Sequence, residues 1–192
     1  MGDTKKLKKK YSTPAHPWNK NTIEVEKKLV KEFGLKKKKE IHIANSFLKK
    51  YKNIAKALIA DKSAQGLTEK KQVLTKLQRY GFIQADAELD QILSIELKDI
   101  LERRLQSIVC RRGLAKTMNQ ARQFITHRQV MVGTKEITSP SYLTTTTEAE
   151  SVSFKPTSAL ASAEHPERFR AAVPVKEEAP APKSTEKNTK QE

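Results

Sequence analysis

The chain has 192 residues and carries 38 lysines and arginines against 22 aspartates and glutamates, a formal net charge of +16. Hydrophobic residues make up 36% of it, below the usual share of a globular domain, so we expect a modest core with much basic surface and tail. The one cysteine, Cys110, excludes an intrachain disulfide framework and a thiolate zinc site and fits an intracellular protein. No apolar run reaches membrane-spanning length, and the N-terminus lacks the apolar core of a signal peptide. The charge favours a polyanion as partner.

The first 21 residues combine lysine with proline and show no helical periodicity. This composition predicts an extended basic arm over 1–21 that orders only against its partner. Lys9, Lys10 and Lys20 are candidate phosphate contacts within it. Trp18 could stack on a base or pack on a protein neighbour, and the sequence leaves both readings open.

Residues 22–98 carry apolar side chains at helical spacing and are predicted to form a helical domain. Three of the four expected helices have a polar cap or a glycine stop. The expected helices are one capped at Thr22 and ended by Gly34, one over 40–60, one capped at Thr68 over 69–80 and ended by Gly81, and one that starts at Ser94 and continues into the next domain.

Four consecutive lysines, Lys36, Lys37, Lys38 and Lys39, join the first two of these helices. As a linker they would be solvated. As a binding loop they would follow phosphates and add affinity without sequence specificity. The sequence alone does not decide between these two interpretations.

Residues 99–160 are predicted to form two short helices and a small β-ribbon, which makes the whole chain α+β. The first stretch, 101–110, places Leu101, Leu105 and Ile108 on one stripe. After it we expect a stop at Gly113 and then a helix from Met118 to about His127. Thr117 should cap this helix, and Gln120 should complete a capping box. A hairpin over 129–137 that turns at 133–134 and a closing strand over 151–154 should follow. Residues 161–192 are a C-terminal extension that we expect to be disordered after about 170, because they are rich in proline and poor in large apolar side chains.

Basic residues dominate the two short helices and their connector, where Glu102 is the only acid between 101 and 128. A solvated cationic face is one interpretation. Because the bias extends over both helices, and because the planar fork of arginine suits phosphate, we favour polyanion binding. The residues picked out by charge and helix face are Arg103, Arg104, Arg111, Arg112, Lys116, Asn119, Arg122, Arg128 and Lys135.

Four motifs in this region occur together in order: Leu101-Glu102-Arg103-Arg104-Leu105-Gln106, Arg112-Gly113-Leu114-Ala115-Lys116-Thr117, Gln120-Ala121-Arg122-Gln123 and Thr138-Ser139-Pro140-Ser141-Tyr142-Leu143. Together they resemble the S-four RNA-binding domain (αL motif) of the small-subunit ribosomal protein S-four family. The segment 11–18, which ends His16-Pro17-Trp18, resembles the N-terminal arm of the archaeal-type branch.

The resemblance implies a structural constituent of the small ribosomal subunit in the cytoplasm. Such a protein binds small-subunit rRNA early in assembly, is present in one copy per subunit and affects decoding accuracy indirectly. It implies neighbours of the S-five and S-three families, near the messenger entry path. Carried over by motif, Arg103, Arg104, Arg112, Lys116, Thr117 and Arg122 are expected to contact RNA. The cysteine-rich zinc site of some members has no counterpart, so we expect neither metal nor cofactor.

Catalytic patterns are missing from the sequence. No Gly-rich phosphate loop occurs and the four histidines are scattered, so we expect no enzyme. The alternatives are an rRNA-processing factor of the same family that acts on pre-ribosomes, an RNA-modifying enzyme with a reduced catalytic part, and a basic protein that binds DNA or acidic membranes without specificity.

Overall fold

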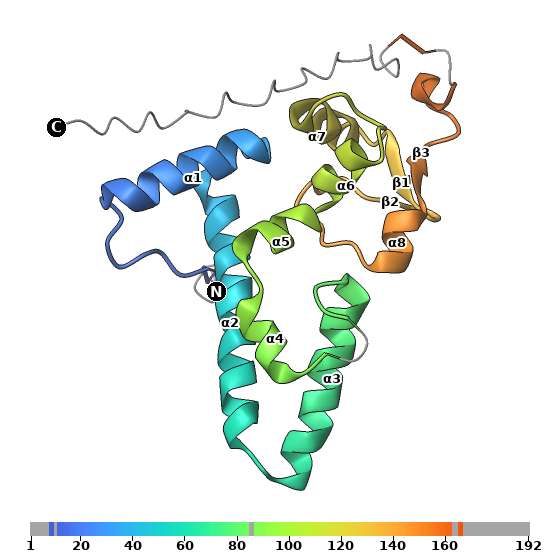
Figure 1. The fold of residues 1–192 in the computed structure, drawn as a ribbon. Helices are drawn as coiled ribbons and strands as arrows, with labels where there is room; N and C mark the ends of the chain where they lie inside the picture. Colours follow the sequence, from blue (N-terminus) through green and yellow to red (C-terminus); the bar gives the residue numbers. More distant parts are fainter. Residues whose placement is uncertain (1–7, 10, 85–86, 163–164, 167–192) are drawn as a thin grey trace, which may run out of the picture.

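The structure is a computed structural model that describes residues 8–9, 11–84, 87–162 and 165–166. A helical half precedes a small unit of helices and strands, which confirms the α+β class (Figure 1). Lys10 and the tail predicted to be disordered after about 170 lie outside the described residues. The elements are α1 (Lys20–Glu32), α2 (Lys38–Ala60), α3 (Ala64–Tyr80), α4 (Leu89–Ser94), α5 (Leu97–Glu102), α6 (Leu105–Arg111), α7 (Met118–Thr126), β1 (Val130–Val132), β2 (Lys135–Glu136), α8 (Thr146–Glu150), β3 (Val152–Phe154) and a 3-10 turn, Ala159–Ala161.

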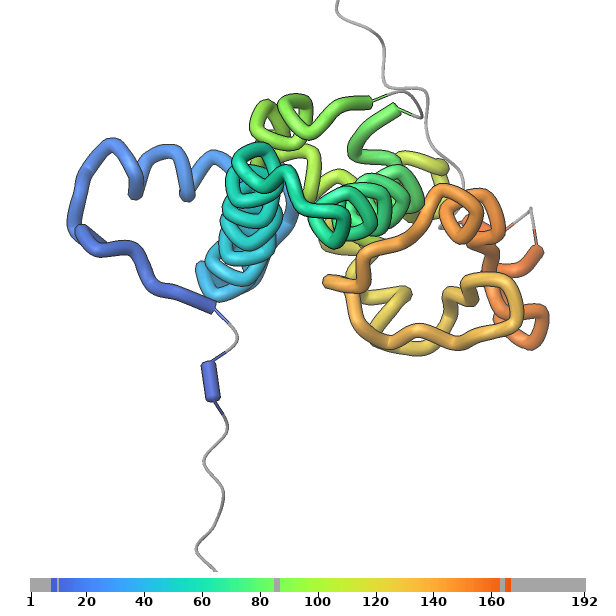
Figure 2. Tube along the Cα trace, turned by 90° about the horizontal axis from the view of Figure 1, so that it is seen from below, coloured from blue at the N-terminus to red at the C-terminus, as the bar shows by residue number. Residues whose placement is uncertain are grey.

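Two apolar clusters hold the helical half together. In one, Tyr51, Leu77 and Ile92 join the α2–α3 hairpin to α4. In the other, Ile100 and Leu101 of α5 pack with side chains of α1 and α2. Seen along the hairpin, α1 lies on one side of it and the strands lie on the other (Figure 2). The hairpin itself projects away from α1, α6 and α7 (Figure 1).

Three helices of this half begin at residues other than those expected. Asn19, not Thr22, caps α1, because its Oδ1 accepts from the Asn21 N–H at 3.1 Å. Ser63 caps α3 through the Gly66 N–H, so Thr68 lies inside the helix. Ser94 ends α4 instead of starting a helix. In each case a second polar residue lies nearby in the sequence, and periodicity does not choose between neighbouring caps.

The predicted continuous helix through 101–110 is wrong, because the chain breaks between α5 and α6. Arg104 is extended, with φ −70° and ψ 143°, and forms an isolated antiparallel bridge with Leu143. The Leu105 N–H donates to the Tyr142 carbonyl at 2.8 Å, and the Thr144 N–H donates to the Arg103 carbonyl at 3.1 Å. A segment about forty residues later therefore satisfies the backbone groups that a helix would have paired internally.

The small sheet forms as predicted. β1 pairs antiparallel with β2, with Val132 opposite Lys135, and with β3, with Val130 opposite Phe154, in the order β2-β1-β3. Leu105 and Ile125 pack against its buried side chains. The sequence analysis did not predict α8, which starts at a capping box formed by Thr145 and Glu148.

Candidate nucleic-acid interface

Gln106 joins the helical half to the second half. Its side chain is buried, and its Nε2 donates to the carbonyls of Phe33 and Gly34, both at 3.2 Å, and of Met118 at 2.9 Å. Gly34 has φ +57°, and a Cβ there would lie 2.8 Å from the Met118 Cβ. The turn after α1 is therefore pressed against the start of α7, and only glycine combines this backbone conformation with this close approach.

Glu40 adds an ionic contact between the same two halves. Its Oε2 lies 2.5 Å from Arg104 Nη2, and its Oε1 lies 2.8 Å from Arg122 Nη2. Burial alone would raise the pKa of the Glu40 carboxyl, but hydrogen bonds and charge from Arg122 and Arg104 outweigh it and lower that pKa. Glu40, Arg104, Gln106 and Arg122 are called the Glu40 seam below.

The close approach at Gly34 also assembles a basic surface. Residues 36–39, called the lysine turn below, begin two positions after Gly34, and all four of these lysines are exposed. Asn119 Oδ1 lies 3.0 Å from where a Gly34 Cβ would be, which places the first turn of α7 beside the lysine turn. Lys116 and Thr117 are exposed at the same end of α7. We define the basic face as residues 36–39 together with Lys116, Thr117 and Asn119.

Local bonds fix the start of α7. Thr117 Oγ1 accepts from the Gln120 N–H at 3.2 Å, as the capping pattern predicts. The returning bond differs from the expected capping box, because Gln120 Oε1 accepts from the Lys116 N–H at 2.7 Å. Lys116 Nζ also lies 3.1 Å from the Pro166 carbonyl. Helix starts attract anions because their N–H groups and dipole are positive there, so this end of α7 suits a phosphate.

The arginines expected to contact RNA separate into different structural roles. Arg104 is 4% exposed, and its pairing with Glu40 corrects the expectation that its guanidinium meets phosphate. The Arg122 side chain is also largely buried, and it pairs with the same Glu40 carboxylate. Arg103 donates to the Gly81 carbonyl at 2.9 Å. Arg112 Nη1 lies 2.8 Å from the Ala149 and Glu150 carbonyls at the end of α8 and 2.9 Å from the Val152 carbonyl at the start of β3, although the residue remains exposed.

Three further candidates, Arg111, Arg128 and Lys135, are exposed. Arg111 is exposed and pairs with Glu102 at 2.6 Å. Arg128, with φ +58°, and Lys135 follow the opposite end of α7 from Thr117. Because nine helical residues span about 13 Å, these two cations are separated from the lysine turn. The structure therefore brings together only part of the predicted set.

The described part of the N-terminal arm lies along α2. The Ser12 N–H donates to Ser46 Oγ at 3.0 Å, and Tyr11 stacks on His42 with ring centroids 6.3 Å apart. Lys39 Nζ sits 5.6 Å from the centre of the Tyr11 ring. Trp18 is 90% exposed. Lys9 and Lys20 are also exposed. Tyr11 thus lies against the lysine turn, whereas Trp18 and Lys20 lie at the start of α1, the end of that helix farther from the turn.

Sequence reasoning missed Gln106 and Glu40 as functional positions. In the sequence, Gln106 is an ordinary member of a motif, and Glu40 is a lone acid that follows four lysines. The two arginines that pair with Glu40 lie 64 and 82 residues from it along the chain. Two of the carbonyls that Gln106 contacts lie 72 and 73 residues from it. No local signal in the sequence identifies such long-range partners.

Within the described residues, no cluster of three or more His, Cys, Asp or Glu side chains could hold a metal ion. No described helix is both long and apolar enough to cross a membrane.

Residues 103–147 match the family model described as the S4 domain. The fold and this match define the second half as an S4 domain, the class of unit that the four motifs indicated.

The chain as a whole is similar to ribosomal proteins. It is 47% identical over 169 residues, 88% of its length and 96% of the relative's, to the small ribosomal subunit protein uS4 of Methanococcus aeolicus. It is 45% identical over 163 residues, 84% of its length and 91% of the relative's, to the protein of that name from Nanoarchaeum equitans. For Methanococcus maripaludis the identity is 44% over 172 residues, 89% of this chain and 97% of the relative. The chain therefore belongs to the small ribosomal subunit protein uS4 family, and the family recognised from its motifs is confirmed. The relatives' names describe a ribosomal protein and not an enzyme.

Proposed function

We propose that this chain is a structural constituent of the small ribosomal subunit and binds small-subunit rRNA directly through the basic face. One observation carries the proposal: the close contact at Gly34 joins the lysine turn to the start of α7. Neither element alone forms an extended basic surface. Held side by side by Gln106 and Glu40, they present cations from both halves of the protein in one fixed arrangement.

The composition of the basic face favours recognition of RNA shape. Lysine side chains make point contacts with phosphates and do not read bases. A rigid set of such contacts selects folded RNA whose phosphates match the spacing, which is how structured RNA is commonly recognised. Trp18 supplies a surface on which an unpaired base could stack. Lys9, Lys10 and Lys20, together with Arg111, Arg112, Arg128 and Lys135, extend the proposed contacts beyond the basic face.

The wider role follows from family analogy. We propose early binding to a multi-helix junction of the rRNA, one copy per subunit, residence in the cytoplasm and an indirect influence on decoding accuracy. The proposed protein neighbours belong to the S-five and S-three families, near the messenger entry path. Because Arg104 and Arg122 hold the two halves together, their part in RNA binding is indirect.

Competition binding tests the proposal with the full chain. A labelled rRNA junction from the small subunit is bound, then challenged with unlabelled junction or with random duplex DNA of equal phosphate number. We expect the junction to compete at least about tenfold better, since specific recognition exceeds charge alone. Equal competition would show a nonspecific polyanion binder. Sedimentation provides the second measurement: finding the chain only on precursor particles would favour the processing factor instead.

A further inference from the structure

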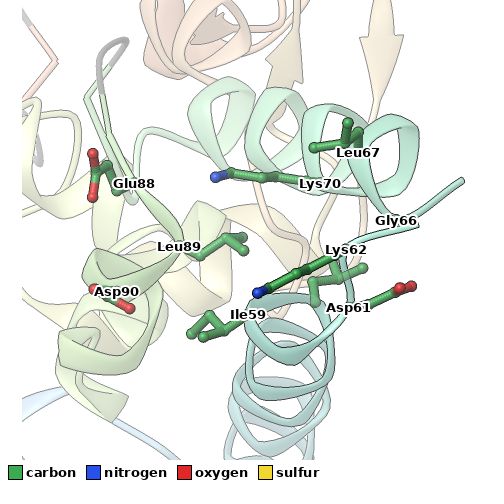
Figure 3. Close-up of a pocket in the computed structure, with 10 residues that line it drawn as sticks. Ile59, Asp61, Lys62, Gly66, Leu67, Lys70, Glu88, Leu89 and Asp90 are labelled. Atoms are coloured by element: carbon green, nitrogen blue, oxygen red, sulfur yellow. The ribbon is translucent and has the colours of Figure 1, made fainter. Parts of the chain in front are cut away.

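A pocket lies at the tip of the α2–α3 hairpin, where these helices meet the start of α4 (Figure 3). It is called the tip pocket below. The hairpin carries this tip away from α1 and α7, so the tip pocket does not belong to the basic face (Figure 1). RNA binding as proposed above makes no use of it.

Apolar side chains at the tip pocket are unusually open to solvent. Ile59 is 47% exposed and Leu67 is 58% exposed, and both belong to the few large apolar residues that the described chain leaves exposed. Leu89, which also lines the pocket, is 4% exposed and forms its base. An open apolar pocket with a polar rim is typical of a surface that contacts another protein.

The charges around the tip pocket differ from those of the rest of the molecule. The ammonium ends of Lys62 and Lys70 extend toward the start of α4, where Glu88 and Asp90 flank Leu89 (Figure 3). None of these four side chains takes part in an ion pair found among the described residues. A chain with a net charge of +16 is thus close to neutral here. Exposed aliphatic groups beside carboxylates disfavour RNA phosphate.

We propose that the tip pocket docks a second protein of the small ribosomal subunit, which inserts one aliphatic side chain between Ile59 and Leu67. This inference rests on the proposed function, because it places the chain in that particle. The docking segment presents a basic group to Glu88 and Asp90 and an acidic group to Lys62 and Lys70. Apolar contact supplies the affinity, and the two opposed charges fix the orientation of the segment.

Photo-crosslinking within small subunits tests the docking directly. The full chain carries p-benzoylphenylalanine in place of Leu67, is incorporated into small subunits, and is irradiated after the subunits are purified by sedimentation. We expect one main product with a small-subunit protein, mapped by mass spectrometry to a segment with an aliphatic residue near a basic one. The matched control replaces Val25 on α1, which is 57% exposed, and is not expected to give that product.

A charge variant then tests the chemistry of the contact. Glu88→Lys combined with Asp90→Lys, in the crosslinking background, should lower the yield of the protein product about threefold or more, since like charges across an interface oppose binding. The pair Glu24→Lys and Glu32→Lys, at exposed positions on α1, should leave the yield unchanged. An unaltered yield in the tip variant would contradict the proposed charge complementarity.

The outcomes separate this inference from the proposed function. If the chain sediments with small subunits but position 67 crosslinks only to rRNA, the tip contacts RNA and the docking proposal is wrong. The docking proposal is equally wrong if the chain is incorporated and position 67 gives no product. If the chain is absent from small subunits altogether, the proposed function and the docking proposal fail together.

Discussion

The Glu40 seam and the lysine turn are neighbours, and both are rich in cations, but the structure uses those cations differently. In the seam, Arg104 is 4% exposed and shares one carboxylate with Arg122. In the lysine turn, all four side chains are exposed, although Lys38 also pairs with Glu26 at 3.1 Å. Burial and partners, more than the type of charge, decide whether a cation stabilises the fold or remains available to a phosphate.

Removing the carboxylate of the seam should have the largest effect. Glu40→Ala leaves two largely covered arginines without their common partner, and breaking such a buried pair typically costs about 3 kcal/mol. Urea unfolding of the full chain measures this. The exposed control Glu69→Ala should change the unfolding free energy by less than about 0.5 kcal/mol. Equal effects of the two variants would show that the Glu40 contacts do not stabilise the fold.

Next in size is the glycine that brings the two regions together. Gly34→Ala places a Cβ 2.8 Å from that of Met118 at φ +57°, and we expect a loss of about 2–3 kcal/mol from clash and strain together. Gly113→Ala is the matched control, because its φ is +74° but its Cβ would meet nothing within 4 Å. Backbone strain alone should cost it about 1 kcal/mol. Unfolding measurements on both variants separate clash from strain. A loss at Gly34 no larger than at Gly113 would contradict tight packing of the turn on α7.

Acid should weaken the seam by a smaller amount. The pKa of Glu40 is lowered from its ordinary value of 4.5, because the hydrogen bonds from Arg122 and Arg104 outweigh burial. The charged form therefore stabilises the fold at neutral pH, and this contribution is lost as the pH falls below 4.5 through the lowered pKa. The difference in unfolding free energy between the native chain and Glu40→Gln should shrink over that range. A difference that grows as the pH falls would show that the ionised Glu40 carboxylate does not stabilise the fold.

Local patterns predicted much of the second half. The stop at Gly113, the cap at Thr117 and the hairpin turn at 133–134 depend on neighbouring residues, and the structure contains all three. The break before Leu105 was not predictable in this way, because it depends on Tyr142 and Leu143 satisfying its backbone. The predicted caps in the helical half were wrong, because several polar residues near each helix start can act as the cap.

In the candidate site, too, local sequence predicts some features, and others depend on tertiary contacts. A run of four lysines predicts a basic surface without further information, and the structure exposes it. The arginines share an RNA-binding motif, but their sequence gives no sign that Glu40 covers two of them. Charge patterns indicate which residues can bind a polyanion. Tertiary contacts determine which of them remain free to do so.

The salt dependence of rRNA binding tests the central claim most directly. The pair Lys36→Ala and Lys37→Ala in the full chain should weaken binding to the rRNA junction and reduce the slope of log K against log salt by up to about 2, one for each lost phosphate contact. Its unfolding free energy should stay unchanged. The control pair Lys56→Ala and Lys71→Ala removes the same charge from exposed positions on the α2–α3 hairpin and should leave the slope unaltered. Equal slopes for the native chain and the lysine-turn variant would contradict the account.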